Sequence, residues 1–207
     1  RKFAQPAARV ADWGLAGAAQ LADVVHHVDV GVLLGLSTAA GAFTEDIVRE
    51  LAAKTERPII FPLSNPTSRA EAHPAELDKW TDGRALIATG SPFAPLQRNG
   101  VERPIAQCNN VYIFPAMGLA VTAAQATRVT DDMMRVAAAT LGDASPALSD
   151  PDQPLLPAWP DVPSVAMRIA HAVAAQAVTD GVAPKRSDDE LTQRIAQVHW
   201  TPEYPEL

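Results

Sequence analysis

A serine–asparagine pair follows one of the apolar runs of the sequence: Ser64-Asn65-Pro66-Thr67 comes directly after Arg57 to Leu63. Pro66 disfavours the α region for Asn65 and keeps that residue extended. The Asn65 carboxamide, with one acceptor and two donors, then points in a defined direction and can recognise a hydroxyl, a carboxylate or a ligand's amide. A turn in which Asn65 or Ser64 bonds only to nearby backbone explains the motif at least as well.

Two adjacent carboxamides, Asn109 and Asn110, lie within the segment 107–115, directly before an apolar run. Burying an unpaired amide costs about 1 to 3 kcal/mol, so each side chain needs a partner in the fold or in a ligand. Helix capping explains one asparagine but not readily the second. A structural role and a ligand-binding role are therefore equally open for this pair.

A third candidate is the loop of small residues from Gly35 to Gly41, which follows the apolar run 28–36 and precedes a helix start. Backbone near Gly35 and Ser37 can approach a dinucleotide, and helix N–H groups can meet its phosphates. Packing in a strand-to-helix turn is the commoner reason for small residues, and the pattern G-x-G-x-x-G is missing. Gly35, Ser37 and Ser64 are thus weaker candidates for cofactor binding.

Other chemically active residues form no recognisable site. Asp131 and Asp132 suit the first turn of a helix better than a cation. Ser91 has no identifiable base, and Cys108, which has no histidine nearby, is expected to be a small buried hydrophobic residue. The five histidines, at positions 26, 27, 73, 171 and 199, lack the spacing of zinc ligands. The adjacent pair, His26 and His27, is expected on a solvated edge.

The elements that position these residues alternate between two kinds. Apolar runs at 28–36, 57–63 and 84–89 predict strands, and the patterns at 44–54 and 74–80 predict helices between them. This alternation is typical of βαβ units and a mostly parallel sheet. Ligands of such sheets bind beyond the carboxyl ends of the strands, which is where Asn65 and the loop after Gly35 are expected.

The second half of the sequence is predicted to be mainly helical. Asn99-Gly100 can form the tip of a hairpin in the loop 90–107. Helices are expected from Asn109 onward and at 130–141, 164–179 and 188–198, and the six prolines between 145 and 163 predict an extended connection. We therefore expect residues 1–143 to be the C-terminal part of a dinucleotide-binding domain, followed at 144–207 by the proline-rich connection and a helical segment.

Composition narrows the class of protein. The chain has 207 residues, 47% hydrophobic and 20% charged, which is enough for a sizeable core. A net charge of −7 without clustered Lys or Arg argues against nucleic acid, and no apolar stretch reaches the roughly 18 to 20 residues of a membrane span. The single cysteine fits a reducing compartment such as the cytoplasm. Because the chain starts at Arg1 without a methionine, we expect a fragment.

Three segments closely resemble the C-terminal half of malic enzymes: 57–67 (RPIIFPLSNPT), 88–93 (ATGSPF) and 107–115 (QCNNVYIFP). Their order and separation match that family, and the segments 43–50 and 200–204 support the resemblance. Thr89 to Phe93 and Pro66 to Arg69 are most similar to the bacterial NAD-linked branch. The resemblance implies a partial Rossmann-like NAD-binding domain with a mostly parallel sheet, followed by C-terminal helices.

It also implies a function: oxidative decarboxylation of malate to pyruvate and CO2 with reduction of NAD, or alternatively NADP, by a homo-oligomeric enzyme. Asn65 and either Asn109 or Asn110 would contact cofactor and malate. The family's catalytic tyrosine and lysine, its glycine-rich phosphate loop and its carboxylate ligands for Mg²⁺ or Mn²⁺ all lie upstream of the segment that resembles Arg1. This chain alone, with no catalytic or metal-binding residue of that set, is expected to be inactive.

Two departures from the family pattern and two rival interpretations accompany the resemblance. Thr38 stands where a glycine is expected, and Ala116 replaces the glycine that usually follows Phe-Pro; each adds a Cβ near a ligand or a packed backbone. One rival is a non-catalytic remnant that binds a dinucleotide or serves assembly. The other is a different dinucleotide-binding dehydrogenase, in which Asn65 and Asn110 are structural.

Overall fold

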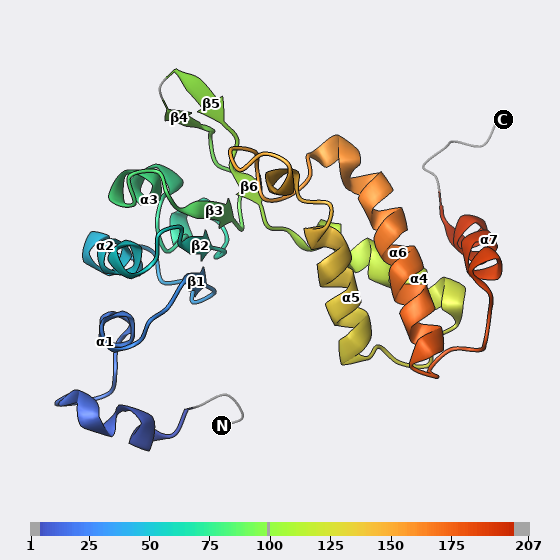
Figure 1. The fold of residues 1–207 in the computed structure, drawn as a ribbon, viewed down its shortest axis with the longest axis horizontal. Coiled ribbons are helices and arrows are strands. Elements are labelled where there is room, and N and C mark those ends of the chain that lie inside the picture. The colour runs from blue at the N-terminus through green and yellow to red at the C-terminus, as the bar shows by residue number, and fades with distance from the viewer. Residues whose placement is uncertain (1–4, 99, 201–207) are drawn as a thin grey trace. The chain divides into compact units, whose positions relative to one another are not determined.

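The computed structural model describes residues 5–98 and 100–200 and contains two compact units, Arg1–Cys108 and Asn109–Leu207, each with its own hydrophobic core (Figure 1). The division falls between Cys108 and Asn109, whereas the sequence predicted a boundary after residue 143. The reason is that the helices between these two positions pack on later helices of the chain. The expected turn residue Asn99 and the family-like segment 201–204 lie outside the described residues.

The first unit is built on a parallel sheet of four strands in the order β1-β2-β3-β6. Val32 of the first strand pairs with Ile59 of the second, and Ile59 pairs with Leu86 of the third. A parallel α/β sheet was predicted, and it is confirmed. The bounds are β1 (Val32–Gly35), β2 (Ile59–Pro62), β3 (Leu86–Thr89) and β6 (Ala106–Gln107).

Helices supply the rest of the first core. Leu33 and Ile60 of the sheet pack with Val48 and Leu77 from two of these helices, and all four are at most 7% exposed. Val32, on the other side of β1, is 51% exposed, because successive side chains of a strand face opposite ways. The helical elements are the 3-10 turns η1 (Ala7–Trp13) and η2 (Thr67–Arg69) and the helices α1 (Leu21–His27), α2 (Glu45–Lys54) and α3 (Pro74–Trp80).

A hairpin leaves the sheet between β3 and β6. Its strands β4 (Leu96–Arg98) and β5 (Val101–Arg103) pair antiparallel, with Arg98 opposite Val101. The hairpin predicted around residues 99 and 100 is therefore confirmed by its flanking strands. Arg98 donates a hydrogen bond to the carbonyl oxygen of Gly83, 2.9 Å away, and so ties the hairpin to the turn that follows α3.

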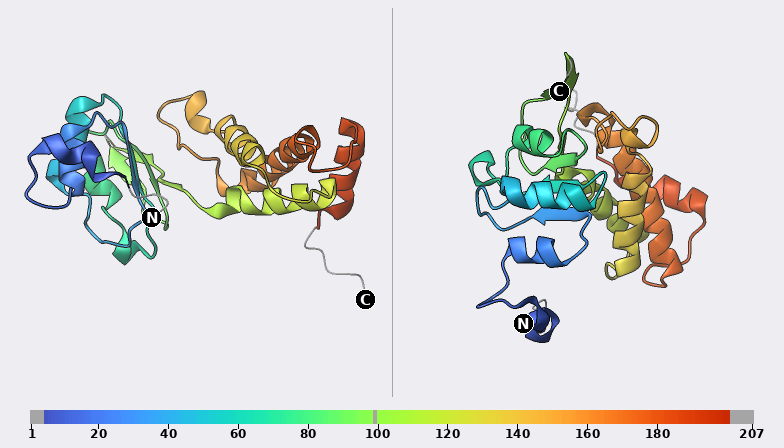
Figure 2. Two further views of the ribbon diagram at one scale, coloured as in Figure 1. Left: turned by 90° about the horizontal axis from the view of Figure 1, so that it is seen from below. Right: turned by 60° about the vertical axis from the view of Figure 1, so that its left-hand side comes forward.

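The second unit is helical (Figures 1 and 2). Its core lies where α4 and α5 pack on α6 and where α7 packs on α4. Helix α6 contributes Ile169 and Val173, both fully buried. The elements are η3 (Asn110–Tyr112), α4 (Phe114–Ala124), α5 (Asp131–Gly142), η4 (Pro146–Leu148), η5 (Trp159–Asp161), α6 (Val162–Thr179) and α7 (Asp188–Val198).

Three further expectations need correction. The proline-rich connection is not wholly extended, because η4 and η5 each use a proline in the first turn, where no N–H is needed. Cys108, expected to be buried, is exposed. The apolar segment after Asn109 begins with a 3-10 turn before α4 starts at Phe114.

No helix among the described residues is long and apolar enough to cross a membrane.

Candidate functional site

Asn65 lies at the carboxyl end of β2, in the turn that the sequence singled out. The peptide bond between Asn65 and Pro66 is cis, and the Asn65 side chain is exposed. Its carboxamide oxygen accepts a hydrogen bond from the Ser91 hydroxyl. No acceptor lies within reach of its amide nitrogen in residues 5–98 and 100–200, so two donors remain available.

Ser91 is itself held in place by the end of β3. The buried Thr89 hydroxyl donates to the Ser91 carbonyl oxygen at 2.8 Å. Gly90 lies so close to the preceding strand that a Cβ there would be 2.0 Å from the Leu63 carbonyl oxygen, which only glycine avoids. The Gln107 amide donates to the Gly90 carbonyl oxygen at 3.2 Å. These contacts fix the position from which Ser91 reaches Asn65.

Glu71 is a fully buried carboxylate directly behind this turn. Its oxygens accept from the Ser64 hydroxyl at 2.5 Å, from the Ser37 backbone N–H at 3.0 Å and from the Ser37 hydroxyl at 3.2 Å. The Glu71 side chain lies against Gly35, where a Cβ would be only 2.4 Å from the Glu71 carboxyl carbon. Gly35, Ser37 and Ser64 therefore meet around one side chain that sequence reasoning did not single out.

The ionised form of Glu71 is the favoured one. Burial by itself raises its pKa, but the hydrogen bonds from the Ser64 hydroxyl and from the backbone N–H groups of Ser37 and Ser64 outweigh that effect and hold the pKa below its ordinary value of 4.5. A carboxylate buried without a cation needs such donors. Glu71 is thus a negative charge that organises two loops at the ends of β1 and β2.

The loop after β1 uses its backbone donors within the protein. The Ser37 N–H bonds to Glu71 and the Thr38 N–H bonds to the Ser64 hydroxyl at 2.9 Å. The Gly41 N–H bonds to the Ala70 carbonyl oxygen at 3.2 Å. Thr38 has a φ of 57°, the left-handed conformation that a β-branched residue rarely adopts. This strain falls where the family resemblance leads us to expect a glycine.

Asn109 and Asn110 differ in their surroundings. The Asn109 carboxamide oxygen accepts from the Val111 N–H at 3.0 Å and so caps η3. The Asn110 side chain is exposed and has no hydrogen-bond partner within the parts of the chain that the structure describes. Both belong to the second unit, and Asn65 belongs to the first. The capping explanation therefore accounts for Asn109 and leaves Asn110 as the better candidate for a ligand.

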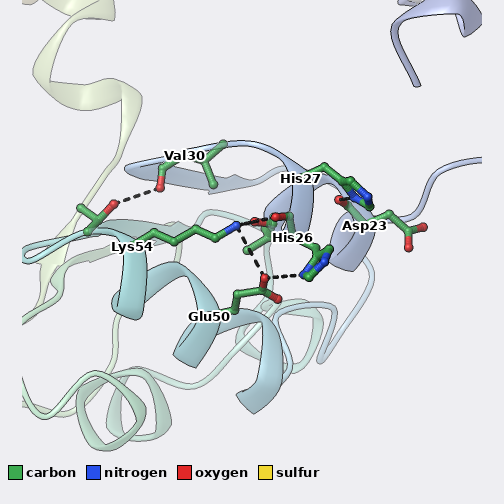
Figure 3. Close-up of polar contacts among 8 residues, drawn as sticks. Asp23, His26, His27, Val30, Glu50 and Lys54 are labelled. Atoms are coloured by element: carbon green, nitrogen blue, oxygen red, sulfur yellow. Dashed lines mark hydrogen bonds and ion pairs between the residues drawn. The ribbon is translucent and has the colours of Figure 1, made fainter. Parts of the chain in front are cut away.

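The adjacent histidines lie exposed on α1, as expected, and take part in a polar cluster with α2 (Figure 3). His26 Nδ1 is 2.8 Å from a carboxylate oxygen of Glu50. The hydrogen bond from His26 is the largest influence on Glu50 and lowers its pKa. His27 Nδ1 bonds to the Asp23 carbonyl oxygen at 2.9 Å. Across residues 5–98 and 100–200, no three His, Cys, Asp or Glu side chains gather in a way that could hold a metal ion.

The chemistry available at the ends of β1 to β3 is recognition by neutral groups. Asn65 offers two N–H donors, and Ser91 and Ser64 are engaged in holding the turn. Such groups orient a hydroxyl, a carboxylate or an amide without exchanging a proton with it. Sequence reasoning proposed Asn65 and Ser64 as candidates, and the structure places both after the end of β2. The same reasoning missed Glu71, for which the sequence carries no motif, and set Ser91 aside because only a nucleophilic role was considered.

Comparisons with known proteins agree on one family. The family model described as "Malic enzyme, NAD binding domain" matches residues 1–178. NAD-dependent malic enzymes from Acinetobacter baylyi and Proteus mirabilis are 51% and 48% identical to the chain over 99% and 98% of its length. The chain spans only 36% of the length of each. It thus corresponds to about a third of these relatives.

Solved structures show the same relationship. The crystal structure of a malic enzyme from Pyrococcus horikoshii matches with a TM-score of 0.66 at 25% identity, over 87% of this chain and 37% of that one. The Entamoeba histolytica malic enzyme, at 23% identity and a TM-score of 0.68, shows the fold alone; the match covers 87% of this chain and 35% of that one.

Proposed function

Because the chain belongs to the malic enzyme family through its NAD-binding domain, we propose that it forms part of an enzyme that oxidises and decarboxylates malate to pyruvate and CO2 while reducing NAD. NAD, when bound, supplies the acceptor for the hydride that leaves the malate C2 carbon. The residues of this chain have a different task, which is to bind and orient the two reactants.

The observation that carries the proposal is the outward-facing amide of Asn65 at the carboxyl end of β2. The nicotinamide carboxamide and the two malate carboxylates all offer oxygen acceptors to such a donor. Asn110, exposed and without a protein partner among the described residues, is the second amide proposed to contact a reactant. Both are neutral, so neither disturbs the proton transfers of the reaction.

In this function, the proton-transfer groups, the phosphate loop and the metal ligands belong to residues outside this chain. The residues at 5–98 and 100–200 do not fit a divalent metal site, because no three potential ligands gather among them. We propose Mg²⁺ or Mn²⁺ held elsewhere in the longer protein, a homo-oligomeric assembly and a cytoplasmic location. NADP is an alternative to NAD. The 207-residue chain by itself is then inactive.

The test is malate-dependent reduction of NAD and of NADP in the presence of Mn²⁺, measured on the product of the gene's longer reading frame and on this chain. Activity of the longer product alone supports the proposal. A longer product that oxidises no malate contradicts it and favours the non-catalytic, dinucleotide-binding alternative.

Substitutions in the longer product test the two amides. Asn65→Ala and Asn110→Ala are each expected to lower kcat/KM by about 10- to 100-fold, the effect of one lost hydrogen bond to a charged group or to the transition state. Gln97→Ala is the control, since it removes an exposed carboxamide that donates to Glu102 within the hairpin. An Asn65→Ala enzyme as active as the Gln97→Ala control would rule out the role given to Asn65.

A further inference from the structure

The Asn65 carboxamide has two possible orientations, and they offer a ligand opposite chemistry. In one, the oxygen faces the protein and the NH2 group offers two donors. In the other, the NH2 group faces the protein and the oxygen offers an acceptor. Which group faces outward therefore decides which part of a ligand can bind at the end of β2.

Ser91 distinguishes the two orientations. Its hydroxyl donates to the Asn65 oxygen, and the residue is only 9% exposed. In the opposite orientation the Asn65 NH2 group would donate to this hydroxyl, whose own hydrogen would then need another acceptor. Within the described ranges, the Asn65 oxygen is the acceptor found for it. Leaving a buried O–H unpaired is unfavourable, so the first orientation is preferred.

The backbone around Ser91 is built to hold this contact. Thr89, 1% exposed, donates through its hydroxyl to the Ser91 carbonyl oxygen. The Gly90 N–H donates to the Pro62 carbonyl oxygen at 3.2 Å, and the Cys108 N–H donates to the Thr89 carbonyl oxygen at 2.8 Å. The backbone that carries the Ser91 hydroxyl is thus hydrogen-bonded to β2 on one side and to the residue after β6 on the other.

We propose that Ser91 is a positioning residue that turns the Asn65 amide outward and so commits this position to a hydrogen-bond acceptor, a carboxylate or carboxamide oxygen of the bound reactant. The assignment of the acceptor rests on the proposed function. The orientation does not, because it follows from contacts within the first unit. Ser91 itself has no contact with the ligand in this scheme.

Proton exchange of the side-chain amides, followed by NMR on the 207-residue chain, tests the orientation without any activity. The Asn65 resonances are identified by their loss in Asn65→Asp. Their exchange with water is expected to stay within about twofold of that of Asn110, which also has no described partner, since exchange reports hydrogen-bond protection. A protected Asn65 proton that loses its protection in Ser91→Ala would show the opposite orientation and overturn the proposal.

Steady-state kinetics of the longer product test the positioning role. Ser91→Ala is expected to raise the KM of one reactant by about 5- to 10-fold, the effect of one hydrogen bond, with a smaller change in kcat. Ser91→Thr keeps the hydroxyl and is expected to restore the KM. A raised KM for NAD assigns the acceptor to the nicotinamide carboxamide, and a raised KM for malate assigns it to a carboxylate.

Ser145→Ala is the matched control, because it also removes a serine hydroxyl that donates a hydrogen bond, here to the Leu155 carbonyl oxygen at 2.6 Å in the second unit. The KM for NAD and the KM for malate are both expected to stay unchanged in Ser145→Ala. Ser91→Ala kinetics equal to those of the control would overturn the positioning role. If the unsubstituted longer product oxidises no malate, the proposed function fails, and the exchange measurement alone still decides the orientation.

Discussion

At the scale of the residue, Glu71 shows how a charge can be buried without a counterion. Removing a carboxylate from water is unfavourable unless hydrogen bonds replace the lost hydration. Glu71 obtains them from hydroxyl and backbone N–H groups of Ser37 and Ser64. The same bonds join the loop after β1 to the turn that carries Asn65, so the buried charge positions the proposed ligand site.

Glu71→Gln is expected to reduce the free energy of unfolding at neutral pH by about 1 to 3 kcal/mol, because a carboxamide brings N–H groups to face donors. The folded-state pKa of Glu71 is lowered below 4.5, so its ionised form stabilises the fold above that pH, and the effect is lost as the pH falls through the folded-state value. The difference between the two proteins should therefore shrink on acidification.

Urea unfolding curves between about pH 7 and about pH 4 measure this difference. Glu102→Gln, at an exposed position of the hairpin, is the control and should leave stability nearly unchanged. A difference between Glu71→Gln and the original protein that stays constant with pH would argue against an ionised Glu71.

Thr38→Gly is expected to stabilise the first unit by about 1 kcal/mol, because glycine adopts the left-handed conformation without the strain of a Cβ. The gain is limited by the greater freedom of glycine in the unfolded chain and by the loss of the Thr38 hydroxyl bond to the Ser37 carbonyl oxygen. Thr38→Ala keeps the Cβ and serves as the control. Urea midpoints that rank alanine above glycine would contradict this interpretation.

The candidate site could be predicted only in part. Asn65 was singled out as a candidate because its position depends on local features, an apolar strand before it and a proline after it. Glu71 and Ser91 act through contacts with residues 34 and 26 positions away in the chain, respectively, and no spacing rule in one sequence reveals such partners. Cys108 was wrongly expected to be buried, because residue type alone says little about a position at the end of a short strand.

At the scale of the element, three helices end against a basic side chain supplied from elsewhere in the chain. Lys54 donates to the carbonyl oxygens of Val25 and His26 at the end of α1, 2.5 and 2.6 Å away (Figure 3). Arg84 reaches the end of α2 in the same way, and Arg194 reaches the end of α4. The last carbonyl groups of a helix have no partner within it and carry partial negative charge, which a cation satisfies.

Lys54→Met is expected to speed amide hydrogen exchange in α1 while leaving α3 unchanged, because methionine keeps much of the apolar stem and loses the donor. Lys79→Met is the matched control, at an exposed lysine in the last turn of α3. Exchange measured by mass spectrometry resolves both segments. Equal exchange of α1 in the two variants would mean that the lysine does not secure this helix.

Helix bounds were easier to predict than strand bounds. Pro74 opens α3 and Ser187 caps α7, and both helices have the predicted limits because these start signals are local. The strand predicted from Val28 to Leu36 is limited to Val32–Gly35, since a strand ends where its neighbour stops pairing. The short β6 was not predicted, because a two-residue strand has no periodicity to detect.

At the scale of the whole molecule, the described residues form two separate cores. One gathers Leu33, Val48, Ile60 and other residues of the sheet unit, and the other gathers Ile169, Val173 and other residues of the helical unit. No residue belongs to both. We therefore expect each unit to unfold in its own step. A single cooperative unfolding transition of the whole chain would contradict this expectation.

Ile60→Ala and Ile169→Ala form a matched pair that tests this, because both remove the same atoms from fully buried positions. Each is expected to destabilise its own unit by about 2 to 5 kcal/mol and to leave the other transition in place. Urea unfolding followed by NMR signals from each unit measures the two steps separately. A shift of both transitions by either substitution would show that the units unfold together.

The exposed position of Cys108, the last residue of the first unit and the only cysteine of the chain, makes it a natural attachment point for a reporter. Although solvent reaches the side chain, the surrounding protein desolvates the thiol and raises its pKa, so a maleimide dye should couple slowly at neutral pH and faster in mildly alkaline buffer. A dye attached there lies two residues before Asn110 in the chain, the second amide proposed to contact a reactant. Its fluorescence would then follow ligand binding in real time, without any engineered cysteine.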